Sequence, residues 1–550
     1  MKITLLSIHA KYIHSSLGLW YLAAGIEEHA FLRHDIHIAE ATINQTLQDI
    51  TRTATLANPD IIGISTYIWN ARLLEDLIIK IREQLPYVKL VFGGPEASCN
   101  AEYWIRKQVD YVICGEGEEN LPMLLDALQT SDEEALLRIP GLCFCREGKI
   151  QTNTDTPPPT KYVDPYSEKY YQSLKGRIAY IETSRGCPYR CAYCLSGSTV
   201  YGFTCGVRFF PIETMKSQIL KLSKSGTQTI KFVDRTFNCH AKSAREIWKY
   251  IIDLETDCCF HFEVAGDLFD DASIDLLRTA PPGRIQLEIG LQSFHQETLN
   301  AVSRKTHQET AVRHTKRLLA PNNIHIHVDL IAGLPYETLP IFAESFRQAY
   351  EIQAHTLQLG FLKLIHGSRL RENAAEYGIQ YDENPPYEIQ QSPWLSPSDL
   401  TDLGHAENAI QHTYNKGRYL QTLDYVLTTT SAHPYHFYHA LGVAVPHHAL
   451  QLDRYTEALY LHFTTLPGVH PDTLKDRLIC DLLTMTKGKC MPGFLKASGS
   501  LRKRAHTKAN VHLRRIVDFD EVAVLSTGEE VCVDANQRDP VTDLYPLLYL

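Results

Sequence analysis

The chain has 550 residues, of which 44% are hydrophobic and 21% charged, a composition typical of a soluble globular protein with about three domains. The formal net charge of −10 argues against binding of polyanions over the whole surface, although a local basic patch stays compatible with it. Because the sequence has no run of eighteen apolar residues and its start lacks a signal-peptide pattern, we expect no membrane span and a reducing, cytoplasmic location for the 14 cysteines.

Residues 1–130 alternate short apolar runs with segments of helical periodicity, which predicts a doubly wound α/β domain. The runs cover residues 3–8, 36–39, 61–65, 90–92 and 111–114. Ligands bind such sheets at the carboxyl ends of the strands, and glycine lets the backbone approach a ligand closely. Each glycine pair alone is also compatible with an ordinary turn. The candidate binding residues in these loops are His14, Ser65, Thr66, Gly93, Gly94, Pro95, Gly115, Glu116 and Gly117.

Residues 131–176 are predicted to form a connector. A polar break is followed by a β-hairpin around residues 141–150 and by a stiff extended segment, Asp155-Thr-Pro-Pro-Pro-Thr. Cys143 and Cys145 lie two apart on a strand and could be metal ligands, but we favour packing at an edge strand. The connector separates two functional bodies.

Three cysteines occur within eight residues in Cys187-Pro-Tyr-Arg-Cys191-Ala-Tyr-Cys194, directly after an apolar β-like run and a Ser-Arg-Gly turn. Thiolates are soft ligands suited to iron–sulfur clusters and to zinc. A structural zinc site needs four protein ligands, whereas no fourth cysteine follows at ligand spacing. The alternative is three unrelated buried thiols. We predict an iron–sulfur cluster with one iron left open.

Strand and helix candidates alternate again after this motif. Strands are predicted at residues 178–183, 229–234, 260–265, 285–291, 324–332 and 356–364. Six parallel strands with intervening helices predict a (β/α)6 partial TIM barrel over residues 177–380, with its chemistry at the carboxyl ends of the strands. Polar residues occur at those ends, although any single one could instead cap the next helix.

The cysteine motif and the strand-end segments Phe232-Val-Asp234, Leu287-Glu288-Ile-Gly-Leu-Gln292-Ser and Asp329-Leu-Ile-Ala-Gly333-Leu-Pro resemble the radical S-adenosylmethionine superfamily. The resemblance implies that Cys187, Cys191 and Cys194 hold a 4Fe-4S cluster. The open iron binds S-adenosylmethionine (SAM) in that family, and one electron cleaves SAM to give a 5′-deoxyadenosyl radical. The resemblance also implies SAM contacts from Tyr193, Asp234, Glu288, Gln292, Arg304, Asp329 and Gly333.

The loops of the first domain resemble the Rossmann-like cobalamin-binding domain that precedes the barrel in many radical SAM enzymes, which implies that the nine loop residues above bind cobalamin. Such domains carry Asp-x-His-x-x-Gly after the first strand when a protein histidine binds cobalt. Nothing between Ala10 and Gly18 fits this pattern. Asp35-Ile-His37-Ile-Ala-Glu40 ends in glutamate and lies within the second strand, so His37 is interpreted as structural. We expect cobalamin without a protein histidine on cobalt.

Residues 381–550 begin with a Pro- and Gln-rich passage and are predicted to be a mainly helical extension, with helices at 400–414 and 455–463 and one hairpin at 521–533. The region resembles an extension found in an uncharacterised group, and the hairpin is too small for the RNA-binding barrel of the methylthiotransferase branch. A metal site is one hypothesis for a group of histidines, but we favour polar helix packing: His433, His436, His439, His447 and His448. A basic cluster could bind phosphate or RNA, although a solvated helix face is the default interpretation: Arg502, Lys503, Arg504, Lys508, His512, Arg514 and Arg515.

The expected protein is a cytoplasmic, oxygen-sensitive, cobalamin-dependent radical SAM enzyme, with methylation of an unactivated carbon as the leading reaction. One alternative is radical rearrangement or cyclisation without methyl transfer. Another is a non-catalytic cobalamin- or redox-sensing module, against which the complete set of strand-end residues argues, because a sensor needs no open iron. We expect a small-molecule or peptide substrate, an electron donor such as flavodoxin or ferredoxin, and no nucleic-acid partner. No catalytic residue is assigned beyond the cluster and the cofactors.

Overall fold

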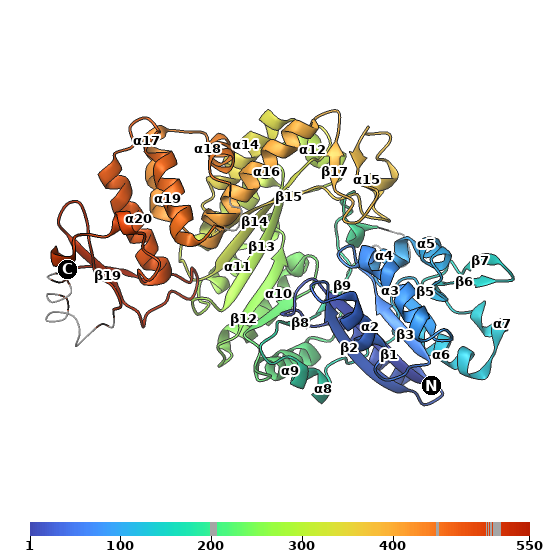
Figure 1. Ribbon diagram of the computed structural model, residues 1–550. Helices are drawn as coiled ribbons and strands as arrows, with labels where there is room; N and C mark the ends of the chain where they lie inside the picture. Colours follow the sequence, from blue (N-terminus) through green and yellow to red (C-terminus); the bar gives the residue numbers. More distant parts are fainter. Residues whose placement is uncertain are drawn as a thin grey trace. The chain divides into compact units, whose positions relative to one another are not determined.

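The computed structural model describes residues 1–198, 206–446, 450–501, 503, 505, 509, 517 and 519–550. These residues form two compact units, each built from separate stretches of the sequence, which Figure 1 colours from blue at the N-terminus to red at the C-terminus. The first unit combines Met1–Val264, Asn300–Lys305 and Leu362–Ser392. The second unit combines Ala265–Leu299, Thr306–Phe361 and Pro393–Leu550.

The first unit begins with a seven-stranded sheet of order β2-β1-β3-β4-β5-β6-β7, drawn in blue to cyan in Figure 1. Its parallel strands are β1 (Lys2–His9), β2 (Asp35–Thr42), β3 (Ile61–Ser65), β4 (Lys89–Gly93) and β5 (Tyr111–Ile113). The strand order reverses between β1 and β3. In doubly wound sheets this switch point is where ligands bind, beyond the carboxyl ends of the strands.

Helices cover both faces of this sheet. On one face lie α1 (Leu17–His29) and α6 (Asn120–Thr130), and on the other lie α2 (Leu47–Thr55), α3 (Ala71–Gln84) and α5 (Ala101–Arg106). Short helices α4 (Pro95–Cys99) and α7 (Glu133–Leu136) complete this part. Because side chains alternate along a strand, Ile3 and Leu5 enter the core under α1 and α6, whereas Leu6 and Ile8 enter the opposite core.

The predicted hairpin forms β6 (Leu142–Arg146) and β7 (Lys149–Thr152), which continue the first sheet antiparallel to β5. Cys143 is buried in the core of the first domain, and its sulfur accepts a hydrogen bond from Thr152 Oγ1 at 3.3 Å. Cys145 is exposed. The structure therefore supports the packing interpretation for Cys143 at the edge of the sheet.

A second group of parallel strands follows in the same unit. It contains β8 (Ala179–Ile181), β11 (Thr229–Phe232) and β12 (Cys259–Val264), with α8 (Glu168–Ser173) before them and α9 (Ile212–Ser223) and α10 (Ala241–Asp253) between them. A short antiparallel pair, β9 (Ser184–Arg185) and β10 (Arg208–Phe209), flanks the cysteine motif. The strand directly before the motif, β9, is thus held by pairing with β10.

Residues 362–392 return to the first unit and carry α15 (Arg369–Glu372), β16 (Gln380–Tyr381) and β17 (Ile389–Gln391). Tyr387 Oη donates a hydrogen bond to Glu96 Oε1 at 2.5 Å, and both residues are buried. The guanidinium of Arg371 lies 4.5 Å from the centre of the Tyr387 ring. This late segment therefore packs against the first domain of the chain.

The second unit contains three further parallel strands, β13 (Ile285–Gln292), β14 (His325–Ala332) and β15 (Thr356–Phe361). They alternate with helices α11 (Asp271–Leu277), α12 (Gln296–Ala301), α13 (Gln308–Leu319) and α14 (Leu339–Tyr350). All six strands predicted for the barrel are present, each within a few residues of its predicted ends.

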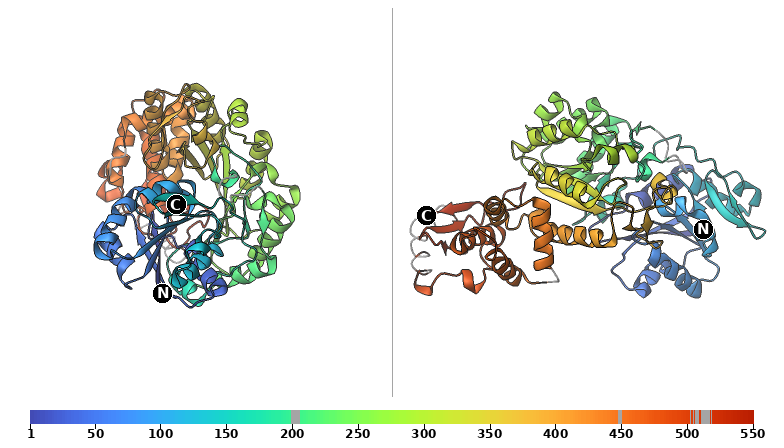
Figure 2. Two further views of the ribbon diagram at one scale, coloured as in Figure 1. Left: turned by 90° about the vertical axis from the view of Figure 1, so that its right-hand side faces the viewer. Right: turned by 90° about the horizontal axis from the view of Figure 1, so that it is seen from above.

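The C-terminal part of the second unit is mainly helical, as predicted (Figure 2). Its helices are α16 (Pro397–His412), α17 (Leu420–Thr430), α18 (Pro434–Ala444), α19 (Leu452–Phe463) and α20 (Pro471–Thr486). The predicted hairpin is present as part of a three-stranded antiparallel sheet of β18 (Ala523–Val524), β19 (Glu530–Val533) and β20 (Leu547–Tyr549). Among the described residues, no helix has the length and apolar character needed to cross a membrane.

Candidate active site

The cysteine motif occupies the loop after β9 in the first unit. Its free thiols are those of Cys187, Cys191 and Cys194. The Ala192 amide donates a hydrogen bond to the Val302 carbonyl at 2.8 Å, and the Leu370 amide donates to the Ala192 carbonyl at 2.9 Å. Two segments that are distant in the sequence therefore hold the middle of this loop in place.

A positive charge lies beside the buried thiol of this loop. Arg304 Nη1 is 3.8 Å from Cys191 Sγ, and the guanidinium lies 5.2 Å from the centre of the Tyr189 ring. Burial raises the pKa of the Cys187 thiol, whose sulfur is 3.5 Å from Thr236 Oγ1. Arg304 is thus a partly buried cation in contact with one of the three predicted cluster ligands.

The donor set fits an iron–sulfur cluster. Among the described residues, no three His, Cys, Asp or Glu side chains are grouped to hold a single metal ion. In a four-iron cluster the thiolates bind different irons, so their sulfur atoms need not meet at one point. Burial, followed by the charge of Cys191, raises the pKa of the Tyr193 phenol. Tyr193 is therefore a neutral aromatic side chain beside the predicted cluster.

Asp234 anchors the strand ends that precede the motif. It follows β11 and is buried, and burial raises its pKa. Its Oδ1 accepts hydrogen bonds from Thr183 Oγ1 at 2.7 Å and Ser184 Oγ at 2.5 Å, and its Oδ2 accepts one from the Thr183 amide at 2.9 Å. The carboxylate thus ties the end of β8 to the end of β11. A contact between Asp234 and the SAM amino group stays a prediction.

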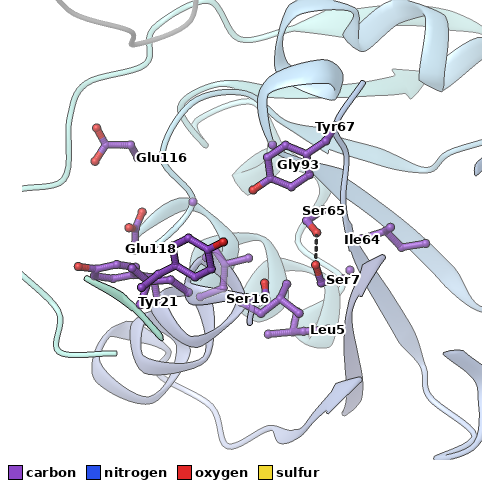
Figure 3. Close-up of a pocket in the computed structure, with 18 of the residues that line it drawn as sticks. Leu5, Ser7, Ser16, Tyr21, Ile64, Ser65, Tyr67, Gly93, Glu116 and Glu118 are labelled. Carbon is purple, nitrogen blue, oxygen red and sulfur yellow. Dashed lines mark hydrogen bonds between the residues drawn. The ribbon is translucent and has the colours of Figure 1, made fainter. Parts of the chain in front are cut away.

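A cavity of about 620 Å³ opens at the carboxyl ends of β1, β3, β4 and β5 (Figure 3). This volume is in the usual range for small-molecule sites. Leu5 and Ile64 give it apolar surface, while the hydroxyls of Ser7 and Ser65, 3.3 Å apart, face one another at its wall. Seven of the nine predicted cobalamin-binding residues line it: His14, Ser65, Gly93, Gly94, Gly115, Glu116 and Gly117. A pocket with a glycine-rich rim and mixed polarity fits a large ligand with amide and apolar groups, as the resemblance implies.

Thr66 and Pro95 do not belong to the lining of this cavity. Thr66 is buried, and its Oγ1 donates to the Gly93 carbonyl at 2.8 Å and accepts from the Ala97 amide at 2.7 Å. Gly94 has φ of +94°, and a Cβ there would lie 2.7 Å from the Thr66 carbonyl oxygen. Thr66 therefore shapes the glycine loop from behind, which sequence reasoning could not separate from a direct ligand contact.

The cavity also has a wall from the second group of strands, which the sequence analysis missed. Tyr180 and Glu182 of the β8 segment, Arg185 of β9 and Arg235 after β11 line it. Tyr180 and Glu182 are two residues apart and so point to the same side of the strand. That spacing, directly before the cysteine motif, was the available signal.

The two histidines considered as cobalt ligands have different surroundings. His14 Nδ1 lies 2.7 Å from Tyr180 Oη, and burial lowers the pKa of His14, so its imidazole is neutral with one nitrogen engaged. His37 is exposed on β2 and does not line the cavity. The absence of a protein histidine on cobalt stays a prediction.

The remaining predicted SAM contacts lie in the second unit: Glu288 and Gln292 on β13, Asp329 on β14, and Gly333 after it. Gln292 has φ of +69° and lies at a register shift between β13 and β14. Gln308 Nε2 donates to the carbonyls on both sides of Gln292, those of Leu291 at 2.8 Å and Ser293 at 2.6 Å. Such a strained residue persists only where its neighbours fix it, and strained residues cluster at functional sites.

A buried carboxyl group supports the same turn. Glu337 Oε1 accepts hydrogen bonds from Ser293 Oγ at 2.5 Å and Ser345 Oγ at 2.9 Å. Ser293 Oγ in turn accepts from the His295 amide at 2.9 Å. Burial raises the pKa of Glu337 to about 7, against the opposing effect of the two hydroxyls. Glu337 links the ends of β13 and β14 and was not singled out from the sequence.

The C-terminal candidates show no metal site in the part of the chain that the structure describes. His439 Nε2 is 3.2 Å from Asp402 Oδ1, and the His433 and His436 rings lie 5.0 Å apart on α18. These contacts are those of packed polar helices. His447 and His448 lie outside the described residues, as does most of the predicted basic cluster, of which Lys503 alone is described.

Comparison with known families assigns all three parts of the chain. Residues 3–125 match the B12 binding domain, residues 181–349 match the radical SAM superfamily, and residues 375–526 match a protein family of unknown function, DUF4080. The predicted recognition and fold class are thereby confirmed, including the uncharacterised C-terminal extension.

Individual relatives are distant. The cobalamin-dependent radical SAM methyltransferase TokK of Streptomyces tokunonensis is 24% identical over 346 residues, covering 59% of this chain and 50% of TokK. An anaerobic magnesium-protoporphyrin IX monomethyl ester cyclase of Synechocystis is 28% identical over 261 residues, covering 45% of this chain and 50% of the cyclase. This chain spans about half the length of both relatives. A solved structure of the cobalamin-dependent radical enzyme OxsB with aqua-cobalamin and S-adenosylmethionine bound shares the fold, with a TM-score of 0.57, 13% identity, and coverage of 94% of this chain and 82% of OxsB.

Proposed function

We infer that this chain, which belongs to the radical S-adenosylmethionine enzymes with an N-terminal B12 binding domain, transfers a methyl group to an unactivated carbon atom of its substrate. Its cofactors are cobalamin, a 4Fe-4S cluster and SAM. When bound, the cluster supplies the electron that cleaves SAM, and cobalamin carries the methyl group.

The observation that carries this proposal is that the β8 segment both lines the cavity and leads into the cysteine motif. Tyr180 and Glu182 line the cavity of the first domain, and Cys187 follows five residues after Glu182. Both features lie in the first unit. A pocket that only stored or sensed cobalamin would not need a wall built from the strand that leads into the cluster loop.

The residues of the chain would hold and tune this site. Arg304 lies beside Cys191 and brings a positive charge to the predicted cluster loop. Asp234 fixes the strand end before the loop through Thr183. Burial raises the pKa of Glu182 to about 7, although the Arg185 guanidinium opposes this shift. Glu182 is thus a carboxyl group on the cavity wall that can hold or release a proton near neutral pH.

A second candidate is ring closure or rearrangement without methyl transfer. The similarity to the Synechocystis cyclase supports it, since that relative is 28% identical to this chain, against 24% for the methyltransferase TokK. The two reactions differ in their by-products. Methylation at carbon yields one S-adenosylhomocysteine and one 5′-deoxyadenosine per turnover, whereas cyclisation yields no S-adenosylhomocysteine.

The test is an anaerobic reaction of the reconstituted protein with SAM carrying a CD₃ group, a chemical reductant and a cell extract as substrate source. We expect 5′-deoxyadenosine and S-adenosylhomocysteine in about equal amounts, together with a product that has gained the labelled methyl on carbon. 5′-Deoxyadenosine without S-adenosylhomocysteine would favour cyclisation, and neither product would favour a sensing module. We propose flavodoxin or ferredoxin as the physiological electron donor and the reducing cytoplasm as the location, because the cluster requires reduced thiols.

A further inference from the structure

Arg185 is the centre of a buried charge network on the cavity wall. Its guanidinium lies 2.5 Å from Glu116 Oε2, 2.6 Å from Glu118 Oε1 and 2.9 Å from Glu182 Oε2. It also lies 4.6 Å from the centre of the Tyr21 ring. The side chain of Arg185 is only 15% exposed and that of Glu118 only 8%. Arg185 thus contacts three acidic side chains in a region where water screens charges poorly, and one of them, Glu116, is also paired with Arg208.

On one side, this network is connected to the cysteine motif by strand β9. Arg185 pairs with Arg208 in the short β9–β10 ladder. Gly186 follows with φ of +97°, and a Cβ there would lie 2.1 Å from the Gly206 carbonyl oxygen, so the backbone packs closely at this point and only glycine fits. The next residue is Cys187. A displacement of Arg185 would therefore move the first cluster ligand.

On the other side, the network reaches the glycine loop of the cavity. Glu116 and Glu118 lie in the Gly115-Glu-Gly-Glu loop between β5 and α6, and Glu118 lies beside Tyr21 (Figure 3). A Cβ on Gly25 of α1 would lie 2.3 Å from the Glu118 carbonyl oxygen, and one on Gly117 would lie 2.8 Å from Leu22. The loop is thus packed directly on α1. Its position determines the shape of the cavity rim.

We propose that Arg185 is a positioning residue that couples the cobalamin cavity to the cluster loop, so that filling one site stabilises the other. This inference rests on the proposed cofactor use but not on methyl transfer. Without Arg185, Glu118 and Glu182 lose the guanidinium that pairs with them, and the loop between β5 and α6 keeps only the contact of Glu116 with Arg208 of β10. Linkage between the two sites must be reciprocal, and couplings of this kind are usually about 5- to 150-fold in affinity.

The experiment measures the dissociation constant of hydroxocobalamin by absorbance titration for two forms of the full-length protein. One form carries the cluster, and the other lacks it because Cys187, Cys191 and Cys194 are replaced by alanine. The ratio of the two dissociation constants, cluster-free over cluster-loaded, measures the coupling between the sites. We expect the cluster to tighten cobalamin binding of the otherwise wild-type protein at least about five-fold. In Arg185→Gln this ratio should fall to about one. Glu118→Gln should lower it as well, and it serves as the milder variant if the first fails to fold.

Arg82→Gln is the matched control. Arg82 also forms a partly buried ion pair in the first domain, 2.5 Å from Asp110 with a side chain 22% exposed, but it lies on α3 without a link to the cysteine loop. Its ratio should equal that of the wild type. A ratio near one in the wild type, or a wild-type ratio in Arg185→Gln, would overturn the proposal. Absence of a methylated product would refute only the proposed reaction, since the titration does not depend on turnover.

Discussion

Replacing Gln292 by glycine should stabilise the second unit and weaken SAM binding at the same time. Gln292 has φ of +69°. This left-handed conformation costs an L-residue about 1–2 kcal/mol. Glycine adopts it freely but loses about 0.5–1 kcal/mol more conformational entropy on folding. The balance predicts a gain of about 0.5–1 kcal/mol in the free energy of unfolding, which corresponds to a rise in Tm of roughly 1–4 °C for a body of this size.

The Gln353→Gly variant is the matched control. Gln353 has φ of +59° and is exposed in the turn before β15, at the amino end of that strand. It should gain the same stability without any change in SAM affinity. Gln292→Gly also removes a side chain predicted to contact SAM. Loss of one hydrogen bond of about 0.5–1.5 kcal/mol should raise the Kd for SAM by about 2- to 13-fold.

Both variants can be compared by thermal unfolding and by equilibrium dialysis of SAM with the anaerobically reconstituted protein. If Gln353→Gly is stabilised but Gln292→Gly is destabilised, the release of strain at Gln292 is not the dominant effect. An unchanged Kd for SAM in Gln292→Gly would refute the assignment of this residue to the SAM site. The two readouts fail independently of each other.

Cys191→Ala should abolish both the cluster of about four irons, measured by iron analysis, and SAM cleavage; cleavage that persists would rule out the cluster assignment. Burial raises the pKa of Glu337 to about 7, so the carboxyl group ionises at lower pH in the unfolded chain than in the folded protein. Between pH 5 and pH 8 the wild-type protein should therefore lose about 2–3 kcal/mol of unfolding free energy relative to Glu337→Gln. A pH-independent difference in unfolding free energy between the two proteins would contradict this. Alanine at His14 or His37 should leave the paramagnetic resonance spectrum of bound cob(II)alamin unchanged, and loss of a nitrogen coupling in either variant would reveal a protein ligand. Filter binding should detect no appreciable affinity for bulk RNA at physiological salt, whereas salt-sensitive binding that disappears when the basic residues 502–504 become serine would make RNA a candidate substrate.

The strands and the cysteine motif were predictable because their signals are local. The apolar run before Cys187 and the spacing of the three thiols are complete within about fifteen residues of sequence. The alternation of burial along β13 likewise follows directly from its sequence pattern. Such features need no knowledge of which distant segments meet.

The supporting residues were not predictable, because their roles depend on contacts across the chain. Thr66 looked like a ligand contact but bonds to Gly93 and Ala97 behind the loop. Arg185 was interpreted as part of a turn. Two of its three acidic partners, Glu116 and Glu118, come from the first domain, 69 positions earlier in the case of Glu116. Glu337 gains its role only when β13 and β14 lie side by side. Sequence patterns of one element cannot reveal such pairings.

The hydrogen bond between Tyr387 and Glu96 joins residues 291 positions apart. This separation means that the two partners become available at different times during translation. At about 5–20 residues per second, roughly 15–60 s pass between the translation of the two residues. During that interval the first domain can close its own sheet, but Glu96 still faces water or a chaperone instead of its phenol partner. Packing of the Tyr387 segment onto the first domain is thus delayed until most of the chain has been synthesised. The nascent first domain therefore folds early but exposes the surface around Glu96 until that segment arrives.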